Sequence, residues 1–241
     1  MPPRQHSDLD SYEQAGFAFP VRVLPEHEAS RLGEQHLAAI SNTMRSPERV
    51  NPHLLFPWVD ALCRAPPLLE AVSAVLAPAG GGAGVLLWES AWFLKRPSIG
   101  AATGDKQGGG APPEFVSFHQ DSTYLGLRHG GKLTTAWIAL SESSARTGCL
   151  RVLSGSHRAG QLPHSTGSDP LNQLSKGQVV TVSPEESRAA VELVLQPGEA
   201  SLHHERLVHA SDSNTDENSV RLGLAVRYIA ATEAPASPPD W

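Results

Sequence analysis

A histidine and an aspartate stand two residues apart at the end of an extended segment. The segment runs from Phe115 to Asp121 and ends His119-Gln120-Asp121. Residues i and i+2 of a β-strand point to the same face, so the imidazole of His119 and the carboxylate of Asp121 can reach a common point. Such a pair alone is more often a polar surface pair, because the chain has 11 histidines. A metal site therefore needs a further ligand elsewhere.

A second group of histidines, His203, His204 and His209, can supply that ligand. Two nitrogens and one carboxylate oxygen on one face of a metal are the donor set of non-haem iron(II) oxygenases, which keep the remaining positions open. His209 and His204 are both candidates for the distal ligand. Neighbours on a strand face opposite sides, so we expect His203 to point away and His204 to lie near the site, beside the metal or facing substrate.

Arg221 opens an apolar run that reads as a strand, Leu222 to Tyr228. An arginine beside such a metal site can hold a dicarboxylate through two parallel charge-assisted hydrogen bonds, which lysine cannot reproduce. The sequence thus offers both a metal site and an anion site.

Helices are expected in the first part of the chain, residues 1–84. Pro25 stands where a helix could start, and a second helical stretch runs from about Trp58 to Leu76, where the Pro66-Pro67 pair must interrupt or restart it. Apolar positions at helical spacing support the first of these helices: Ala29, Leu32, Leu37 and Ile40.

Residues 85–230 change to short apolar runs broken by glycine, proline and asparagine, which is typical of antiparallel strands. The candidate strands are Val85–Leu94, Lys132–Leu140, Cys149–Leu153, Gln178–Val182, Val191–Leu195, Ala200–His203 and Leu222–Ile229. Seven strands after a helical region predict a mainly β fold, a barrel or jelly roll with the N-terminal helices packed outside. A length of 241 residues is compatible with one catalytic domain over residues 1–241.

The glycine- and proline-rich residues 98–113 are expected to form a mobile loop. As a hypothesis, this loop lies near the metal and acts as a lid. Equal proteolysis with and without substrate would remove that idea.

Several short motifs follow one another along the chain. They are His119-Gln120-Asp121, the Gly-Cys-Leu-Arg-Val-Leu-Ser-Gly-Ser-His-Arg run of residues 148–158, His209-Ala210-Ser211, and Arg221. Together, over residues 85–229, they resemble the phytanoyl-CoA dioxygenase family. The resemblance implies a double-stranded β-helix (a cupin-like jelly roll), with Fe(II) as metal, 2-oxoglutarate as co-substrate and dioxygen as oxidant.

The resemblance also implies the roles of single residues. Iron would be held by His119, Asp121 and His209, because the register to Ser211 and Arg221 favours His209 over His204. 2-Oxoglutarate would be held by Ser211 and Arg221. Two further residues, Lys95 and Trp137, match positions that line the co-substrate pocket in relatives. The alternative is that neither residue lines the pocket: Trp137 would then be a core residue and Lys95 a solvated strand end.

The resemblance implies hydroxylation of a substrate with release of succinate and carbon dioxide. Halogenating relatives carry a small residue at the position of Asp121, so its carboxylate favours hydroxylation. Two alternatives stay open. A redox-inactive cupin-like metalloprotein, an isomerase or lyase, would not need Ser211 or Arg221 in their positions. A non-enzymatic binding domain of the same fold would not need all three metal ligands.

The composition indicates which classes of binding partner and which cellular compartment to expect. The formal net charge is −6, and acidic and basic residues are mixed along the chain, so no basic stripe suits nucleic acid or an anionic membrane. Cys63 and Cys149 form no Cys-x-x-Cys pair, which favours a reducing cytoplasm. No window approaches the roughly 18 apolar residues of a membrane helix. We therefore expect a cytoplasmic enzyme acting on a small molecule, with homo-oligomerisation left open.

Overall fold

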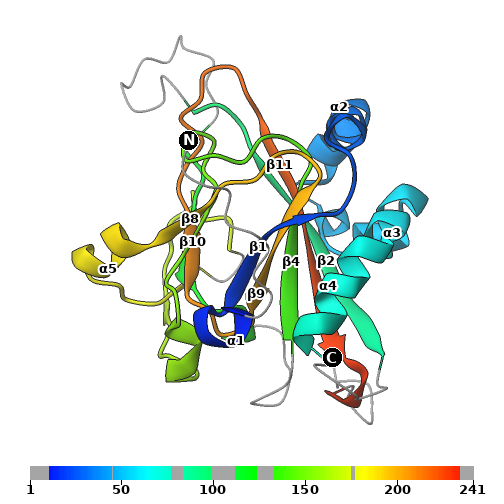
Figure 1. The fold of residues 1–241 in the computed structure, drawn as a ribbon. Helices are drawn as coiled ribbons and strands as arrows, with labels where there is room; N and C mark the ends of the chain where they lie inside the picture. The colour runs from blue at the N-terminus through cyan, green and yellow to red at the C-terminus, as the bar shows by residue number, and fades with distance from the viewer. Residues whose placement is uncertain are drawn as a thin grey trace, which may run out of the picture.

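Two antiparallel sheets form the core of the computed structural model, which describes residues 11–44, 46–76, 84–98, 112–123, 133–174 and 177–233. The larger sheet has the order β1-β9-β4-β11-β2 and the smaller sheet the order β3-β10-β5-β8, and the two face each other (Figure 1). The larger sheet comprises β1 (Phe17–Arg22), β2 (Val85–Lys95), β4 (Leu133–Ala139), β9 (Glu199–His204) and β11 (Arg221–Ala230). The smaller sheet comprises β3 (Val116–His119), β5 (Leu150–Val152), β8 (Val191–Leu193) and β10 (His209–Ser211).

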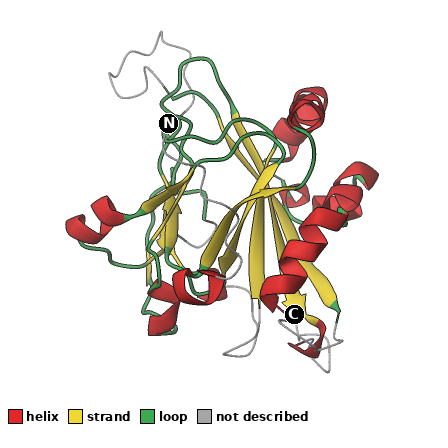
Figure 2. Cartoon of the chain, in the orientation of Figure 1, coloured by secondary structure: helices red, strands yellow, loops and turns green. Residues whose placement is uncertain are grey.

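Helices cover the outer face of the larger sheet (Figure 2). They are α2 (Glu26–Thr43), α3 (Pro57–Cys63) and α4 (Pro66–Leu76), while the short α1 (Tyr12–Ala15) and α5 (Pro184–Ala189) lie elsewhere. The first long helix begins directly after Pro25, as predicted. The Pro66-Pro67 pair starts a new helix, because proline in the first turn gives up no intrahelical hydrogen bond. Within the described residues, none of the helices combines the length and apolar character that crossing a membrane requires.

The larger sheet is buried on both faces. On the outer face, residues such as Ile138, Leu202 and Leu224 pack against the helices. On the inner face, Trp137 and Ala225 pack against residues of the smaller sheet. Because strand residues alternate between these faces, every second residue of β4, β9 and β11 is directed into the space between the sheets. The predicted mainly β fold with helices packed outside is confirmed.

Two predicted regions differ in the structure, and a third lies largely outside the described residues. The strand β1 lies within the region expected to be helical, where it pairs with β9 at the edge of the larger sheet. Most of the predicted loop over residues 98–113 lies outside the described residues, namely 99–111. Of the seven candidate strands, Gln178–Val182 is reduced to a two-residue strand, β7 (Gln178–Val179), which pairs only with β6 (Ser165–Thr166).

Candidate metal and co-substrate site

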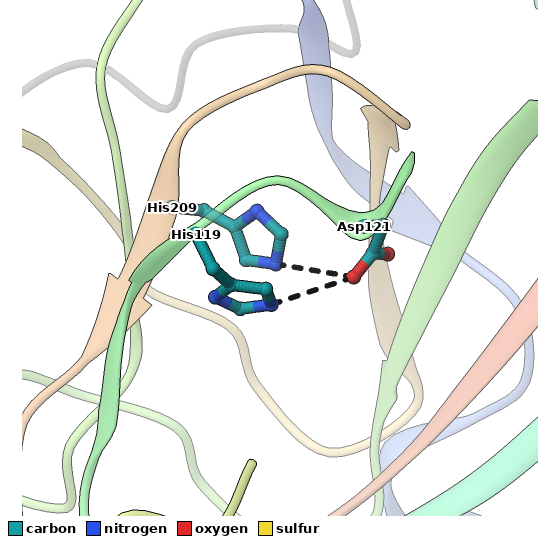
Figure 3. Close-up of side chains that lie close together, drawn as sticks. All are labelled: His119, Asp121 and His209. Carbon is teal, nitrogen blue, oxygen red and sulfur yellow. Dashed lines mark ion pairs between the residues drawn. The ribbon is translucent and has the colours of Figure 1, made fainter. Parts of the chain in front are cut away.

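His119, Asp121 and His209 converge between the two sheets (Figure 3). His119 ends β3 and His209 begins β10, and the two residues are paired across these neighbouring strands. The Nε2 atoms of His119 and His209 lie 3.4 Å and 3.8 Å from the same oxygen, Oδ1 of Asp121. One potential ligand atom from each residue lies within 4.8 Å of the others. A single ion can therefore contact all three side chains.

Hydrogen bonds to the backbone orient both imidazoles. Nδ1 of His119 lies 2.9 Å from the carbonyl oxygen of Ser117, and Nδ1 of His209 lies 2.9 Å from that of Leu207. A carbonyl only accepts, so each Nδ1 carries the proton and each Nε2 presents its lone pair to the common point. Burial, followed by the neighbouring histidines, holds the pKa of His209 well below its usual range. The ring is thus neutral, which is the form that binds metals.

The carboxylate of Asp121 is ionised and has two different environments. Its Oδ2 accepts a hydrogen bond from Oγ1 of Thr135 at 2.6 Å and lies 3.6 Å from Nε of Arg227. Burial alone would raise the pKa of Asp121, but the charge of Arg227 and contacts from the surrounding histidines outweigh it and hold the pKa well below its usual range. One oxygen therefore faces the two imidazoles while the other faces the larger sheet.

These donors fit an iron(II) centre. Two imidazole nitrogens and one carboxylate oxygen meet from one side, which leaves further coordination positions open. The cavity that they line is also bordered by the polar side chains of Thr135, His203 and Arg227 and by five apolar ones: Phe93, Val116, Trp137, Leu150 and Ala225. The same cavity is lined at its other end by Ser211 and Arg221.

Arg221 is a buried cation without a described counter-charge. Its side chain is 1% exposed, and the guanidinium lies 4.8 Å from the centre of the Trp137 ring. Nη1 donates to the carbonyl of Gly148 at 2.5 Å, but Nε has no hydrogen-bond partner among the described residues, and none of their carboxylates forms a salt bridge with it. Burial lowers the pKa of Arg221 to about 10, so the group stays charged at neutral pH. A buried charge of this kind is stabilised by a bound anion.

Lys95 lies beside Arg221, directly opposite it across β2 and β11. Its Nζ lies 2.6 Å from Oγ and 3.0 Å from the carbonyl oxygen of Ser211, and it also donates to the carbonyl of Asp212. Burial, followed by the charge of Arg221, lowers the pKa of Lys95 well below its usual range. At 1% exposed, Lys95 is no solvated strand end. It holds Ser211 in place, and the structure thus brings Lys95, Trp137, Ser211 and Arg221 together.

The expected orientation of the two adjacent histidines is wrong. His203 points into the site, with its Nε2 3.6 Å from Oδ2 of Asp121. His204 points away, where its ring lies 5.0 Å from that of His157 and its Nδ1 accepts the backbone N–H of Arg206. The two residues do face opposite sides, but the pairing of His203 with Thr135 of β4 decides which side each takes.

Sequence reasoning missed three residues that support the metal site: Thr135, Arg227 and Glu89. Nη1 of Arg227 donates to Oε1 of Glu89 at 2.6 Å, next to its contact with Asp121. Strand alternation carries a signal for two of them. Thr135 stands two residues before Trp137, and Arg227 stands six residues after Arg221, so each shares a face with a residue already assigned to the site.

Comparison with known proteins identifies a family for this chain. Residues 59–221 match the family described as "Phytanoyl-CoA dioxygenase (PhyH)". The peroxisomal phytanoyl-CoA dioxygenase of Homo sapiens is 30% identical over 115 residues, which cover 47% of this chain and 33% of the human protein. The matched part thus spans about a third of that relative's length.

Solved structures show the same fold over nearly the whole chain. The non-heme monooxygenase ThoJ in its apo form is 29% identical with a TM-score of 0.74, covering 97% of this chain and 81% of that one. A nickel complex of ThoJ is 26% identical over the matched residues, covering the same shares of the two chains, with a TM-score of 0.67. EvdO2 from Micromonospora carbonacea var. aurantiaca, complexed with 2-oxoglutarate, is 23% identical with a TM-score of 0.70, covering 98% and 97% of the two chains. This last likeness concerns the fold alone.

Proposed function

This chain belongs to the phytanoyl-CoA dioxygenase family, and on that premise we propose that it is a non-haem Fe(II)- and 2-oxoglutarate-dependent dioxygenase that hydroxylates a small-molecule metabolite. The observation that carries the proposal is one cavity with two complementary ends. One end has two imidazoles and a carboxylate on a common point, and the other has the buried Arg221 without a described counter-charge. A metal and a dicarboxylate together satisfy both ends.

In this proposal His119, Asp121 and His209 hold the iron. Arg221 and Ser211 bind the far carboxylate of 2-oxoglutarate. When bound, iron and 2-oxoglutarate activate dioxygen for oxidation of a substrate C–H bond, with release of succinate and carbon dioxide. The chain contributes orientation and exclusion of water.

Two supporting residues act indirectly on the co-substrate. Lys95 fixes the hydroxyl of Ser211 through its 2.6 Å contact, and the Trp137 ring supports the Arg221 guanidinium at 4.8 Å. A cation over an indole face is attracted by the ring quadrupole, so Trp137 limits where the guanidinium can move. Both residues therefore shape the end of the cavity where the carboxylate would bind.

Hydroxylation is supported by Asp121, since a carboxylate there occupies the position that halogenating relatives leave for a halide. A small metabolite rather than an acyl-CoA thioester is supported by the lack, in the sequence, of a basic cluster suited to the phosphates of coenzyme A. A reducing cytoplasmic location is supported by Cys63 and Cys149, which are both buried free thiols.

The second candidate is a redox-inactive metalloprotein, an isomerase or lyase, on the same three ligands. Such a protein would need the three metal ligands, but it would not need a buried arginine that binds an anion. The burial of Arg221 therefore favours the oxygenase.

Anaerobic reconstitution with Fe(II) and 2-oxoglutarate tests the proposal. The wild type should show the weak visible metal-to-ligand charge-transfer band of the chelate, and His209→Ala should lose it. Arg221→Ala should need about 10- to 100-fold more 2-oxoglutarate, the equivalent of losing one charge-assisted hydrogen-bond pair. Arg146→Ala is the matched control, because its side chain is 73% exposed. A wild type without a band would make the redox-inactive metalloprotein the leading function.

A further inference from the structure

A row of side chains crosses the larger sheet beneath Asp121. Each strand of the sheet contributes one residue, and each residue is directly paired with the next across the strands. The row consists of Phe17, His203, Thr135, Arg227 and Glu89. Four of these five side chains are polar or charged; Thr135, His203 and Arg227 are buried, and Glu89 at the end of the row is partly exposed. Such a buried polar row is costly unless its members satisfy one another.

Side chains at the centre of the row contact Oδ2 of Asp121. Oγ1 of Thr135 donates to Oδ2 at 2.6 Å, and Nε of Arg227 lies 3.6 Å from the same atom. The other oxygen, Oδ1, is the one nearest to His119 and His209. Asp121 is 1% exposed, so both oxygens are shielded from bulk water. The two oxygens thus have separate partners.

Glu89 completes the row by sharing the charge of Arg227. Its Oε1 accepts from Nη1 of Arg227 at 2.6 Å, a shorter contact than the one between Arg227 and Asp121. An arginine with no second carboxylate would pair more closely with Asp121 and compete with a metal for that charge. With Glu89 present, Arg227 fixes the position of Oδ2 without neutralising the ligand.

We propose that Thr135, Arg227 and Glu89 are positioning residues that hold Asp121 as a one-oxygen metal ligand. A carboxylate can bind a metal through one oxygen or through both, and the second mode would take a position needed by co-substrate or dioxygen. For Oδ2 to turn toward the metal, it would have to leave the Thr135 hydroxyl in a buried site, where a lost hydrogen bond is expensive. The inference rests on the proposed metal site but concerns residues outside it.

Cobalt(II) is the probe for this proposal, because its d–d absorption reports the coordination geometry and titration gives a Kd without turnover. Thr135→Val removes the hydroxyl at nearly constant volume, and it should raise the Kd by about 10- to 100-fold and change the d–d spectrum. Thr135→Ser keeps the hydroxyl and should restore both. Thr134→Val is the matched control, since Oγ1 of Thr134 instead contacts Tyr12 and the carbonyl of His203. It should leave the Kd unchanged within about twofold.

Glu89→Gln is the second variant, chosen because its partly exposed side chain is expected to tolerate substitution without unfolding. It should raise the Kd by several-fold, because Arg227 then pairs more strongly with Asp121. Wild-type Kd values and spectra in both Thr135→Val and Glu89→Gln would overturn the positioning role. A wild type that binds no cobalt would instead overturn the proposed function itself.

Discussion

His203 differs from the other two buried imidazoles of the site in having no hydrogen-bond partner. Neither Nδ1 nor Nε2 of His203 makes a hydrogen bond among the described residues, and Nε2 has only the 3.6 Å contact with Oδ2 of Asp121, whereas Nδ1 of His119 and of His209 each bond to a backbone carbonyl. The side chain is 2% exposed and lines the same cavity as the metal ligands. A buried polar group without a partner destabilises a fold, and proteins keep such groups mainly where a ligand needs them.

His203→Phe should therefore stabilise the metal-free protein. Phenylalanine keeps a ring of similar shape while removing two unsatisfied nitrogens, so the free energy of unfolding should rise by about 1 kcal/mol. Urea denaturation of both proteins measures this difference. The charge-transfer band with Fe(II) and 2-oxoglutarate should persist, since the three ligands are intact. A loss of more than about 1 kcal/mol would show that the imidazole serves the fold rather than a ligand.

At the residue scale, the sequence predicts those features of the site that depend only on neighbouring residues. His119 and Asp121 could be paired from the sequence because residues two apart on an extended segment share a face. The choice between His203 and His204 could not be made that way. Alternation requires them to face opposite sides, but the pairing of β9 with β4, a contact distant in sequence, selects the side.

Among the elements, β11 and β4 depend on a glycine for their close contact. A Cβ atom added to Gly223 would lie 2.0 Å from Cζ2 of Trp137, which is far inside van der Waals distance. Gly223 therefore leaves the space in which the indole lies beneath Arg221. The position of the co-substrate end of the cavity thus rests on a residue with no side chain.

Gly223→Ala should displace the Trp137 ring and cost about 1–3 kcal/mol of unfolding free energy, the usual range for overpacking. The affinity for 2-oxoglutarate should fall with it, because the support of the Arg221 guanidinium moves. A double-mutant cycle with Trp137→Ala checks the cause by denaturant unfolding. If the steric clash is responsible, Gly223→Ala should cost little in the Trp137→Ala background. An equal cost in both backgrounds would point to the backbone of β11 instead.

Helices and strands were predicted correctly where the sequence marks the beginning of the element or gives it a long apolar run. The Pro66-Pro67 pair marks the beginning of α4, and the long apolar run after Arg221 marks β11. Prediction failed for β1, which lies in the region expected to be helical, and for β10. The three residues of β10, His209–Ser211, carry two of the proposed site residues, but a run of that length has no periodicity to detect. Only its pairing with β3 and β5 makes it a strand.

Across the whole molecule, the candidate metal site joins the two sheets. His119 and His209 belong to the smaller sheet, while Asp121 is held by Thr135 and Arg227 of the larger one. A metal bound to all three ligands therefore links both layers and is lost on unfolding. Binding to the folded state alone stabilises a protein by mass action, by about 2.7 kcal/mol when the free ion is at 100 times its Kd.

Cobalt(II) at that concentration should raise the melting temperature of the wild type by roughly 5–10 °C, and a chelator should reverse the rise. His209→Ala should lose the effect, because it removes one of three ligands. His204→Ala is the matched control: it deletes a histidine at the end of β9 that faces away from the metal site, so it should keep the full rise. A rise of equal size in His209→Ala would mean that the ion stabilises the fold from another place, and the site between the sheets would then have no part in holding them together.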